Sequence, residues 1–346
     1  MSVLTHILSF LLAISVIWFL SGILIDATDD VARRYRKPGF AVAFFVLGFL
    51  TSIGEFSVAT NATLQGIPQV SAGNLMGASL VIMLFIIPLL AVLGNGIPMT
   101  RALLPSTVAL LLFVVLLPAL VALDGTIAPY EGALMLVLYG FLILRVRKKV
   151  PAHETVTEAL RETQANLINT RYATAMDIAK IIAGAVFIFI AGNVLVDESA
   201  YFARLFSIPV SFVGLLLLSI GTNFPELVIA VRCVLGRHKD IAFGDYMGSA
   251  AANTLIFGLL AVANGTFSIV MSEAVLTCAI AAIGLTLFFL FARTKETLSR
   301  TEGGILLGLY ICFLVFQIFN ALRLPDDTQL EAMSDPQHAA AGNVLP

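Results

Sequence analysis

The chain has 346 residues, of which 59% are hydrophobic and only 12% are charged, and its mean hydropathy is +0.97. A soluble domain of this composition would leave large apolar surfaces in water, so the composition excludes a soluble protein. The net charge of -2 argues against a protein that binds nucleic acid through a basic surface.

Ten apolar segments follow one another along the chain, and a helix of about 20 such residues crosses the roughly 30 Å of hydrocarbon in a bilayer. Backbone groups in lipid must be satisfied within the segment, so these spans are expected to be helices. The expected spans are residues 3–25, 40–64, 69–94, 102–123, 127–144, 177–196, 207–235, 240–264, 267–292 and 302–322. The sequence therefore predicts an all-α, polytopic membrane protein of about ten transmembrane helices.

The positive charges lie almost entirely on one side of these spans. Of the 20 Lys and Arg residues, 17 follow the first, third, fifth, seventh and ninth spans. Loops rich in Lys and Arg stay in the cytoplasm, so the odd-numbered loops are predicted to be cytoplasmic and both termini to face outward.

The two halves of the sequence resemble each other at one fixed offset, the spacing that carries Thr51 onto Thr222. This repeat offset pairs identical residues of types that are scarce in an apolar sequence. The pairs include Asp26 with Asp197, Arg33 with Arg204, Pro38 with Pro209, Thr51 with Thr222, Glu55 with Glu226, Gly73 with Gly244, and Gly77 with Gly248. Five spans separate the copies, and because five is odd the copies cross the membrane in opposite directions. Inverted repeats are typical of secondary transporters, which bind substrate near mid-membrane where the repeats meet.

The repeat divides the chain into four parts. We expect the first five-helix repeat at residues 1–144 and the second at 177–322. Residues 145–176 form the predicted cytoplasmic connection between them. The polar residues 323–346 are predicted to be a disordered, outward-facing tail.

Two carboxylates stand inside long apolar spans, Glu55 in the second span and Glu226 in the seventh. Inserting an ionisable group at such a depth costs roughly 3 kcal/mol even on the milder scales, so each is a candidate functional residue. The alternative is a protonated Glu that only bonds neighbouring helices, and the matching positions of the two residues in the repeat argue against it.

Each Glu ends a short polar motif. The two motifs read Thr51-Ser52-Ile53-Gly54-Glu55 and Thr222-Asn223-Phe224-Pro225-Glu226. The two residues that lie three and four positions before each Glu share its helical face. They supply hydroxyl and amide oxygens, which together with carboxylates are the ligands that hard cations prefer. Helix packing is an alternative role for these side chains, and for Ser52 and Asn223 it is as well supported as ligation.

The eighth span adds a polar stripe, because Asp245, Ser249 and Asn253 recur every four residues. The equivalent stripe of the third span is mostly apolar and consists of Asn74, Ala78 and Ile82. The predicted site is therefore lopsided, with more ligands from the second half. For Asp245, which lies near the cytoplasmic end of its span, a structural cap and a role in the ion path both remain open.

The paired motifs resemble the alpha repeats of the cation/calcium exchanger superfamily, which includes the sodium/calcium exchangers. The resemblance rests on Gly221-Thr222-Asn223-Phe224-Pro225-Glu226 and Gly244 to Ser249 in the second copy, and it covers the first three spans of each half. It implies that cation sites are lined by Thr222, Asn223, Glu226, Ser249 and Asn253, with Thr51, Ser52 and Glu55 opposite. The first copy departs from the family pattern at Leu50, Gly54, Ala78 and Ile82, which favours a simpler stoichiometry than three sodium sites and one calcium site.

The expected function is secondary active antiport of Ca2+ for Na+ or H+, by alternating access at a central Glu–Glu site. A Na+/H+ antiporter on the same fold and a non-transporting membrane sensor or scaffold are the alternatives. The sequence has no GxSxG or HExxH motif, so no enzyme is expected. No cofactor is expected, and the cations are substrates. The expected partners are these cations and membrane lipid, with no nucleic acid, for a chain taken as a monomer in a bacterial plasma membrane.

Overall fold

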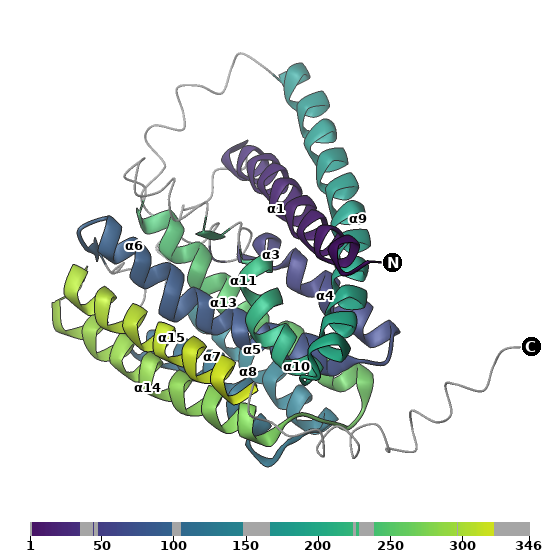
Figure 1. Ribbon diagram of the computed structural model, residues 1–346. Coiled ribbons are helices and arrows are strands. Elements are labelled where there is room, and N and C mark those ends of the chain that lie inside the picture. The colour runs from purple at the N-terminus through teal and green to yellow at the C-terminus, as the bar shows by residue number, and fades with distance from the viewer. Residues whose placement is uncertain are drawn as a thin grey trace, which may run out of the picture.

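The computed structural model describes residues 2–34, 44, 48–98, 105–147, 167–223, 226–227, 239–295 and 297–321. Within these ranges the regular structure is helical apart from four strands of two residues each, so the prediction of an all-α protein is confirmed (Figure 1). The predicted tail at 323–346 and most of the predicted connection at 145–176 lie outside the described residues.

Eight described segments are long and apolar enough to cross a membrane. They comprise α1 (Val3–Arg34), α5 (Pro68–Leu80) with η2 (Val81–Ile86) and α6 (Ile87–Leu93), α7 (Pro105–Val121) with η3 (Ala122–Asp124), α8 (Pro129–Arg147), α9 (Leu167–Phe206), α13 (Lys239–Asn264), α14 (Met271–Lys295) and α15 (Arg300–Ala321). Hydropathy predicts a span at each of these positions. The helix α9 extends the expected sixth span at both ends.

The two remaining expected spans, the second and the seventh, are broken into short pieces. The second contains α3 (Gly48–Thr51) and α4 (Ile53–Leu64), and the seventh contains α10 (Val210–Val213), the π-helical η4 (Gly214–Leu218) and α11 (Ser219–Thr222). The break falls at the same repeat position in both, at Ser52 with ψ 9° and at Asn223 with ψ 12°. Discontinuous helices of this kind form substrate sites in secondary transporters. The broken spans are the two that carry Glu55 and Glu226.

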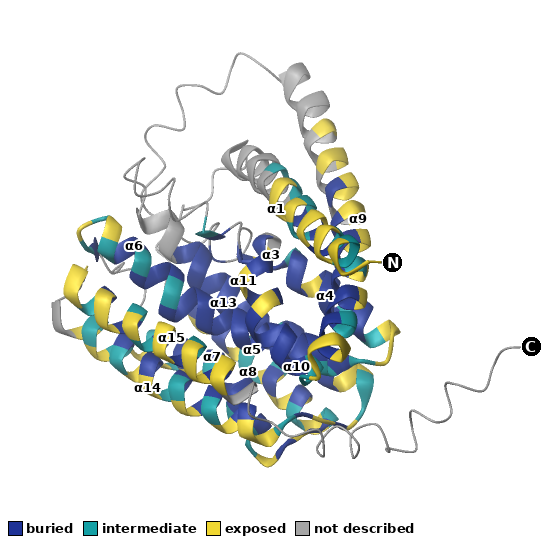
Figure 2. Cartoon of the chain, viewed as in Figure 1, coloured by how far each residue is buried: buried dark blue, intermediate teal, exposed yellow. Residues whose placement is uncertain are grey.

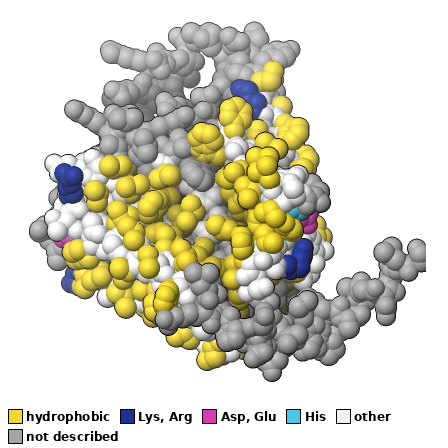
Figure 3. Space-filling model, viewed as in Figure 1, with side chains coloured by type: hydrophobic (Ala, Val, Ile, Leu, Met, Phe, Trp, Pro, Cys, Tyr) yellow, Lys and Arg dark blue, Asp and Glu magenta, His cyan; other side chains and the backbone are white. Residues whose placement is uncertain are grey.

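The helices α5 and α13 lie in the middle of the molecule and are almost wholly buried, whereas α1, α9, α14 and α15 show one exposed side (Figure 2). Hydrophobic side chains spread over the face shown in Figure 3, and Lys and Arg are sparse there. An exposed apolar surface of this extent is what a bilayer covers in a membrane protein.

Two antiparallel ladders tie one repeat to the other at opposite ends of the bundle. The strand β1 (Ile97–Pro98) pairs with β4 (Thr297–Leu298), and β2 (Thr126–Ile127) pairs with β3 (Phe267–Ser268). The repeat offset pairs each residue of β2 with a residue of β4. It pairs β1 with β3 as well, but with a shift of one residue. The two ladders are therefore repeat mates, and α7, which runs from β1 to β2, separates them.

Two helix starts repeat the same cap. The backbone N–H of Ala128 donates to Oε2 of Glu131 at 2.8 Å, and the N–H of Ser299 donates to Oε2 of Glu302 at 2.8 Å. The repeat offset pairs Ala128 with Ser299 and Glu131 with Glu302. The inverted repeat therefore continues to the fifth and tenth spans, beyond the polar pairs that reveal it in the sequence.

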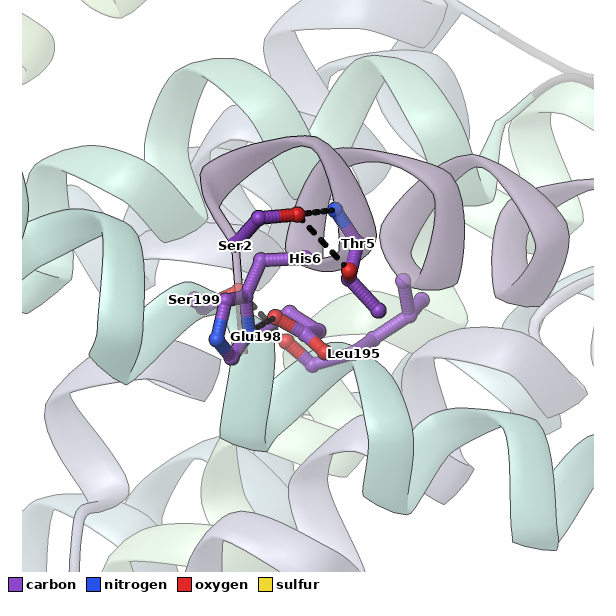
Figure 4. Close-up of polar contacts among 6 residues, drawn as sticks. All are labelled: Ser2, Thr5, His6, Leu195, Glu198 and Ser199. Carbon is purple, nitrogen blue, oxygen red and sulfur yellow. Dashed lines mark hydrogen bonds and ion pairs between the residues drawn. The ribbon is translucent and has the colours of Figure 1, made fainter.

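The helices α1 and α9 run side by side along one flank of the molecule (Figure 1). Near the start of α1, Nδ1 of His6 lies 2.7 Å from Oε2 of Glu198 (Figure 4). The His6 ring also stacks on Tyr201, with ring centroids 3.6 Å apart. The helix α4 joins this pair to the rest of the bundle, since the hydroxyl of Ser57 in α4 donates to the Ile188 carbonyl of α9 at 3.1 Å.

Glycines let the broken spans approach α5 and α13 closely. A Cβ atom at Gly77 would collide with the carbonyl oxygen of Leu215, and one at Gly248 with that of Phe44. The two contacts are repeat mates, since the same offset that pairs Gly77 with Gly248 pairs Phe44 with Leu215. Small residues at helix interfaces allow this approach in membranes.

The change Gly248→Ala is therefore expected to destabilise the fold, by about 1–3 kcal/mol, because the added methyl group meets backbone that cannot move aside. The matched control is Gly308→Ala on α15, where an added methyl group meets no atom within 4 Å. Thermal unfolding in detergent measures both. A Gly248→Ala midpoint equal to that of the control would contradict the packing described here.

Candidate functional site

All nine residues predicted to line the site lie in the interior, around the breaks in the second and seventh spans and along α13. The exposed fraction of each is at most 1%. They are Thr51, Ser52, Glu55, Thr222, Asn223, Glu226, Asp245, Ser249 and Asn253. Burial of this degree is rare for carboxylates and indicates that other groups compensate them.

Hydrogen bonds across the repeat interface bring the two motifs together. The amide of Asn223 donates from Nδ2 to Oε1 of Glu55 at 3.2 Å, and to the carbonyl of Ser219 at 2.7 Å. The first repeat's Glu is thus held by a side chain from the second repeat. Asn223 sits at the helix break, so the break itself positions the donor.

The second carboxylate is connected to the first motif through hydroxyl groups. Ser249 donates from Oγ to Oε1 of Glu226 at 3.1 Å, and its Oγ lies 3.0 Å from Oγ of Ser52. Each of the mirrored acids is therefore linked to the other repeat, Glu55 directly through Asn223 and Glu226 through Ser249 to Ser52.

A second pair of contacts is symmetric in the repeat. The Thr51 hydroxyl donates to Oδ1 of Asp245 at 3.5 Å, and the Thr222 hydroxyl donates to Oδ1 of Asn74 at 3.4 Å. Asn74 is not among the predicted site residues, although the repeat offset pairs it with Asp245. Asp245 lies inside α13, which begins at Lys239, and its contact with Thr51 argues against the interpretation as a helix cap.

Most of the buried polar atoms without a hydrogen-bond partner belong to this cluster. Nine such side-chain atoms occur in the described part of the chain, and seven of them come from six residues of the cluster. The six residues are Glu55, Asn74, Asn223, Glu226, Asp245 and Asn253. Five of the seven atoms are carboxylate or amide oxygens and two are amide nitrogens. Buried acceptors are normally satisfied, so the concentration of unpartnered oxygens points to a ligand that bonds them.

The chemistry of the donors suits hard cations. Carboxylate, hydroxyl and amide oxygens converge, and these are the ligands of Ca2+ and Na+ in proteins. Among the described residues no three His, Cys, Asp or Glu side chains come together as a metal site. A cation held here would therefore draw on the Thr, Ser and Asn oxygens as well as on the two Glu.

Comparison with known proteins gives the family. A profile of sodium/calcium exchanger proteins matches residues 5–147 and 177–319. The chain belongs to the sodium/calcium exchanger family. Each match covers one of the two repeats, so the exchanger repeat and the repeat found in the sequence coincide.

Relatives and a solved exchanger structure agree with this assignment. An uncharacterised membrane protein of Methanocaldococcus jannaschii is 24% identical over 87% of the chain and 94% of its own length. The sodium/calcium exchanger MaX1 of Methanosarcina acetivorans is 34% identical over 41% of the chain and 40% of its own length. The sodium-calcium exchanger NCX_Mj, solved after soaking with Na+ and Sr2+, superimposes with a TM-score of 0.65 at 20% identity, covering 91% of the chain and 99% of NCX_Mj. At this identity the match shows a common fold.

The change Ser249→Ala removes the hydroxyl that connects Glu226 to the first motif. The variant should bind Ca2+ roughly tenfold more weakly than the wild type, which is the effect expected when a hydrogen bond to a carboxylate is lost. Titration calorimetry in detergent measures the affinity. Ser79→Ala is the control, because the Ser79 hydroxyl bonds only to the Leu75 carbonyl of its own helix. Equal affinities in the two variants would contradict a role for the Ser249 bridge.

Proposed function

We propose that this chain exchanges Ca2+ for Na+ or H+ by alternating access, with Glu55 and Glu226 as the central cation ligands. One observation carries the proposal: the two acids at mirrored repeat positions are fully buried, and each is bonded toward the other repeat, Glu55 by Asn223 and Glu226 through Ser249 to Ser52. Among the described residues, each also keeps a carboxylate oxygen without a hydrogen-bond partner. The family profile supports cation antiport in general. The name of the relative MaX1 supports calcium as one of the ions.

Charge compensation explains why such a site would exchange ions and not leak them. In the described residues, no Lys or Arg forms an ion pair with either Glu. An empty site would hold two uncompensated charges in a low dielectric, which costs several kcal/mol. The protein would therefore cross between its two states only with a divalent ion, or with monovalent ions or protons, on the Glu pair. Competition for one site then couples the two fluxes.

The helix α1 is placed to close this site from one side. The branched Cγ2 of Ile17 lies 3.1 Å from where a Cβ of Gly54 would stand, and Ile14 packs in the same way on Gly221. One apolar stretch of α1 thus covers both motifs. A shift of the paired helices α1 and α9 along the central helices would uncover the cluster, and inverted-repeat transporters alternate by such movements.

The lopsided ligand set keeps Na+/H+ antiport as a second candidate. The stripe of α5 continues from Asn74 to Ala78 and Ile82, which are buried and provide no side-chain oxygen. Fewer ligands than a full calcium cage would suit a monovalent ion. The orientation with cytoplasmic odd loops, and the location in a bacterial plasma membrane, belong to the same proposal and rest on the distribution of Lys and Arg.

The direct test is uptake of calcium-45 by inside-out vesicles. Glu226→Gln and Glu55→Gln should each reduce uptake to background, because an amide keeps the shape of the side chain and removes the charge that compensates the ion. Glu302→Gln is the matched control, since Glu302 caps α15 at the helix start and Gln can form the same cap. Unchanged flux in Glu226→Gln would remove Glu226 from the mechanism.

The driving ion follows from the same vesicles. Calcium uptake that persists without Na+ and collapses with the pH gradient identifies Ca2+/H+ exchange, and uptake that requires a Na+ gradient identifies Ca2+/Na+ exchange. Proton movement that depends on Na+, without calcium uptake, would favour the second candidate. A wild-type protein that moves none of these ions would contradict antiport.

A further inference from the structure

The two halves of the site differ in charge at one mirrored position. The Thr51–Asp245 and Thr222–Asn74 contacts are repeat mates, with oxygen–oxygen distances of 3.5 and 3.4 Å. Both link the last residue of a short helix to a buried residue of a central helix. The acceptor is a neutral amide in one half and a carboxyl group in the other.

The contact alone does not require a charge. Asn74 accepts the Thr222 hydroxyl with an amide oxygen in equivalent surroundings, so an amide is enough to hold α11 against α5. If Asp245 served only to hold α3 against α13, asparagine would do the same at a lower desolvation cost. The carboxyl group at this position therefore calls for a role that the neutral mate does not have.

The surroundings of Asp245 show where that charge acts. Asp245 is 0% exposed, and among the described residues its Oδ2 has no hydrogen-bond partner. It lies one helical turn from Ser249 on the same face of α13, a rise of about 6 Å, and Ser249 donates to Glu226. Asp245 also contacts Thr51, whose chain neighbour Ser52 lies 3.0 Å from the same Ser249 hydroxyl. Three acids thus act on one buried cluster, and the described residues include no Lys or Arg paired with Asp245.

We propose that Asp245 determines the preference of the central site for divalent over monovalent cations. The inference rests on the proposed function, in which Glu55 and Glu226 bind the transported ion. The attraction between a fixed charge and an ion is proportional to the charge of the ion. A third carboxylate near the Glu pair therefore strengthens Ca2+ binding by about twice the free energy that it adds for Na+.

The close packing of α3 on α13 indicates that Asp245 acts through its charge on the central site and does not form a second ion-binding site of its own. A Cβ atom at Gly48 would stand 2.6 Å from the carbonyl carbon of Gly248, so the two backbones nearly touch beside the Thr51–Asp245 contact. A second Na+ or Ca2+ at Asp245 would need about five or more oxygen ligands in that space. A fixed charge acting on an ion between the two Glu needs no additional room.

The test removes the charge and then restores it in the mirrored place. Asp245→Asn copies the arrangement already present at Asn74, so the variant should fold with an unchanged thermal midpoint in detergent. Its Ca2+ affinity should fall about tenfold and its Na+ affinity only about threefold, because the logarithms of the two changes differ by the ratio of the ionic charges. The double variant Asn74→Asp/Asp245→Asn puts the third carboxylate in the first repeat, and it should recover most of the lost preference for Ca2+. Titration calorimetry with CaCl2 and with NaCl, on wild type and both variants, gives the affinity ratios.

Three results would overturn the proposal. The first is an Asp245→Asn variant that keeps both wild-type affinities. The second is an Asp245→Asn variant that loses Ca2+ and Na+ affinity by the same factor. The third is an Asp245→Asn variant with a lowered thermal midpoint whose loss of Ca2+ preference is not reversed in the double variant. Either of these two results would make Asp245 a structural residue.

The same measurements separate this inference from the function on which it rests. Wild-type protein that binds neither ion at the Glu pair would overturn the proposed function itself. Wild-type binding that is lost in Glu226→Gln, together with unchanged selectivity in Asp245→Asn, would overturn only the role of Asp245.

Discussion

The cost of holding carboxylates in the middle of a bilayer is the constraint on which the rest of this structure depends. Glu55 and Glu226 are fully buried, and the described residues offer them no basic partner. Their hydrogen bonds to Asn223 and Ser249 offset only part of the lost hydration, and one oxygen of each Glu has no partner. In the proposed mechanism a bound cation or proton supplies the remainder. The desolvation cost of the two acids then makes occupancy of the site a condition for movement between the two access states.

The inverted repeat solves the geometric part of this problem. Each half contributes one broken span, with breaks at Ser52 and Asn223. At these breaks, Asn223 donates to Glu55, and the Ser52 hydroxyl lies 3.0 Å from that of Ser249, the donor to Glu226. In lipid a backbone can be irregular only where it is buried in protein or lines a polar cavity. The central helices α5 and α13 provide that cover, and glycines such as Gly77 and Gly248 bring the broken spans close enough to be covered. The same inverted repeat therefore determines both the arrangement of the helices and the position of the site.

Hydropathy and the repeat offset are enough to predict the spans, the repeat and the two acids, because each of these leaves a local or periodic trace in the sequence. Contacts between distant segments leave no such trace. The stripe that begins at Asn74 continues into Ala78 and Ile82, so its pattern does not mark Asn74 as a site residue, and only the structure shows that it receives the Thr222 hydroxyl. The caps formed by Glu131 and Glu302 are not predicted from the sequence for a different reason. The two residues match at the repeat offset, but acidic residues near the end of a span are common and do not by themselves indicate a cap. Gly54 and Pro225 indicate that the two spans are loosened, but helix propensity does not identify Ser52 and Asn223 as the turning residues.

The chemical difference between the halves bears on how the exchanger works. At three successive turns the second repeat has Asp245, Ser249 and Asn253, where the first has Asn74, Ala78 and Ile82. In the proposed site the cation would therefore be held mainly by α13 and the two broken spans, while α5 gives apolar support. A repeat with identical halves would give its two access states equal energies by symmetry. Of the two mirrored stripes, only the stripe on α13 has a carboxylate and unpartnered oxygens, at Asp245 and Asn253, so rearrangement around the ion would change the contacts of the two halves unequally. The inward-open and outward-open states of this protein should therefore differ in ion affinity even in the absence of a membrane potential.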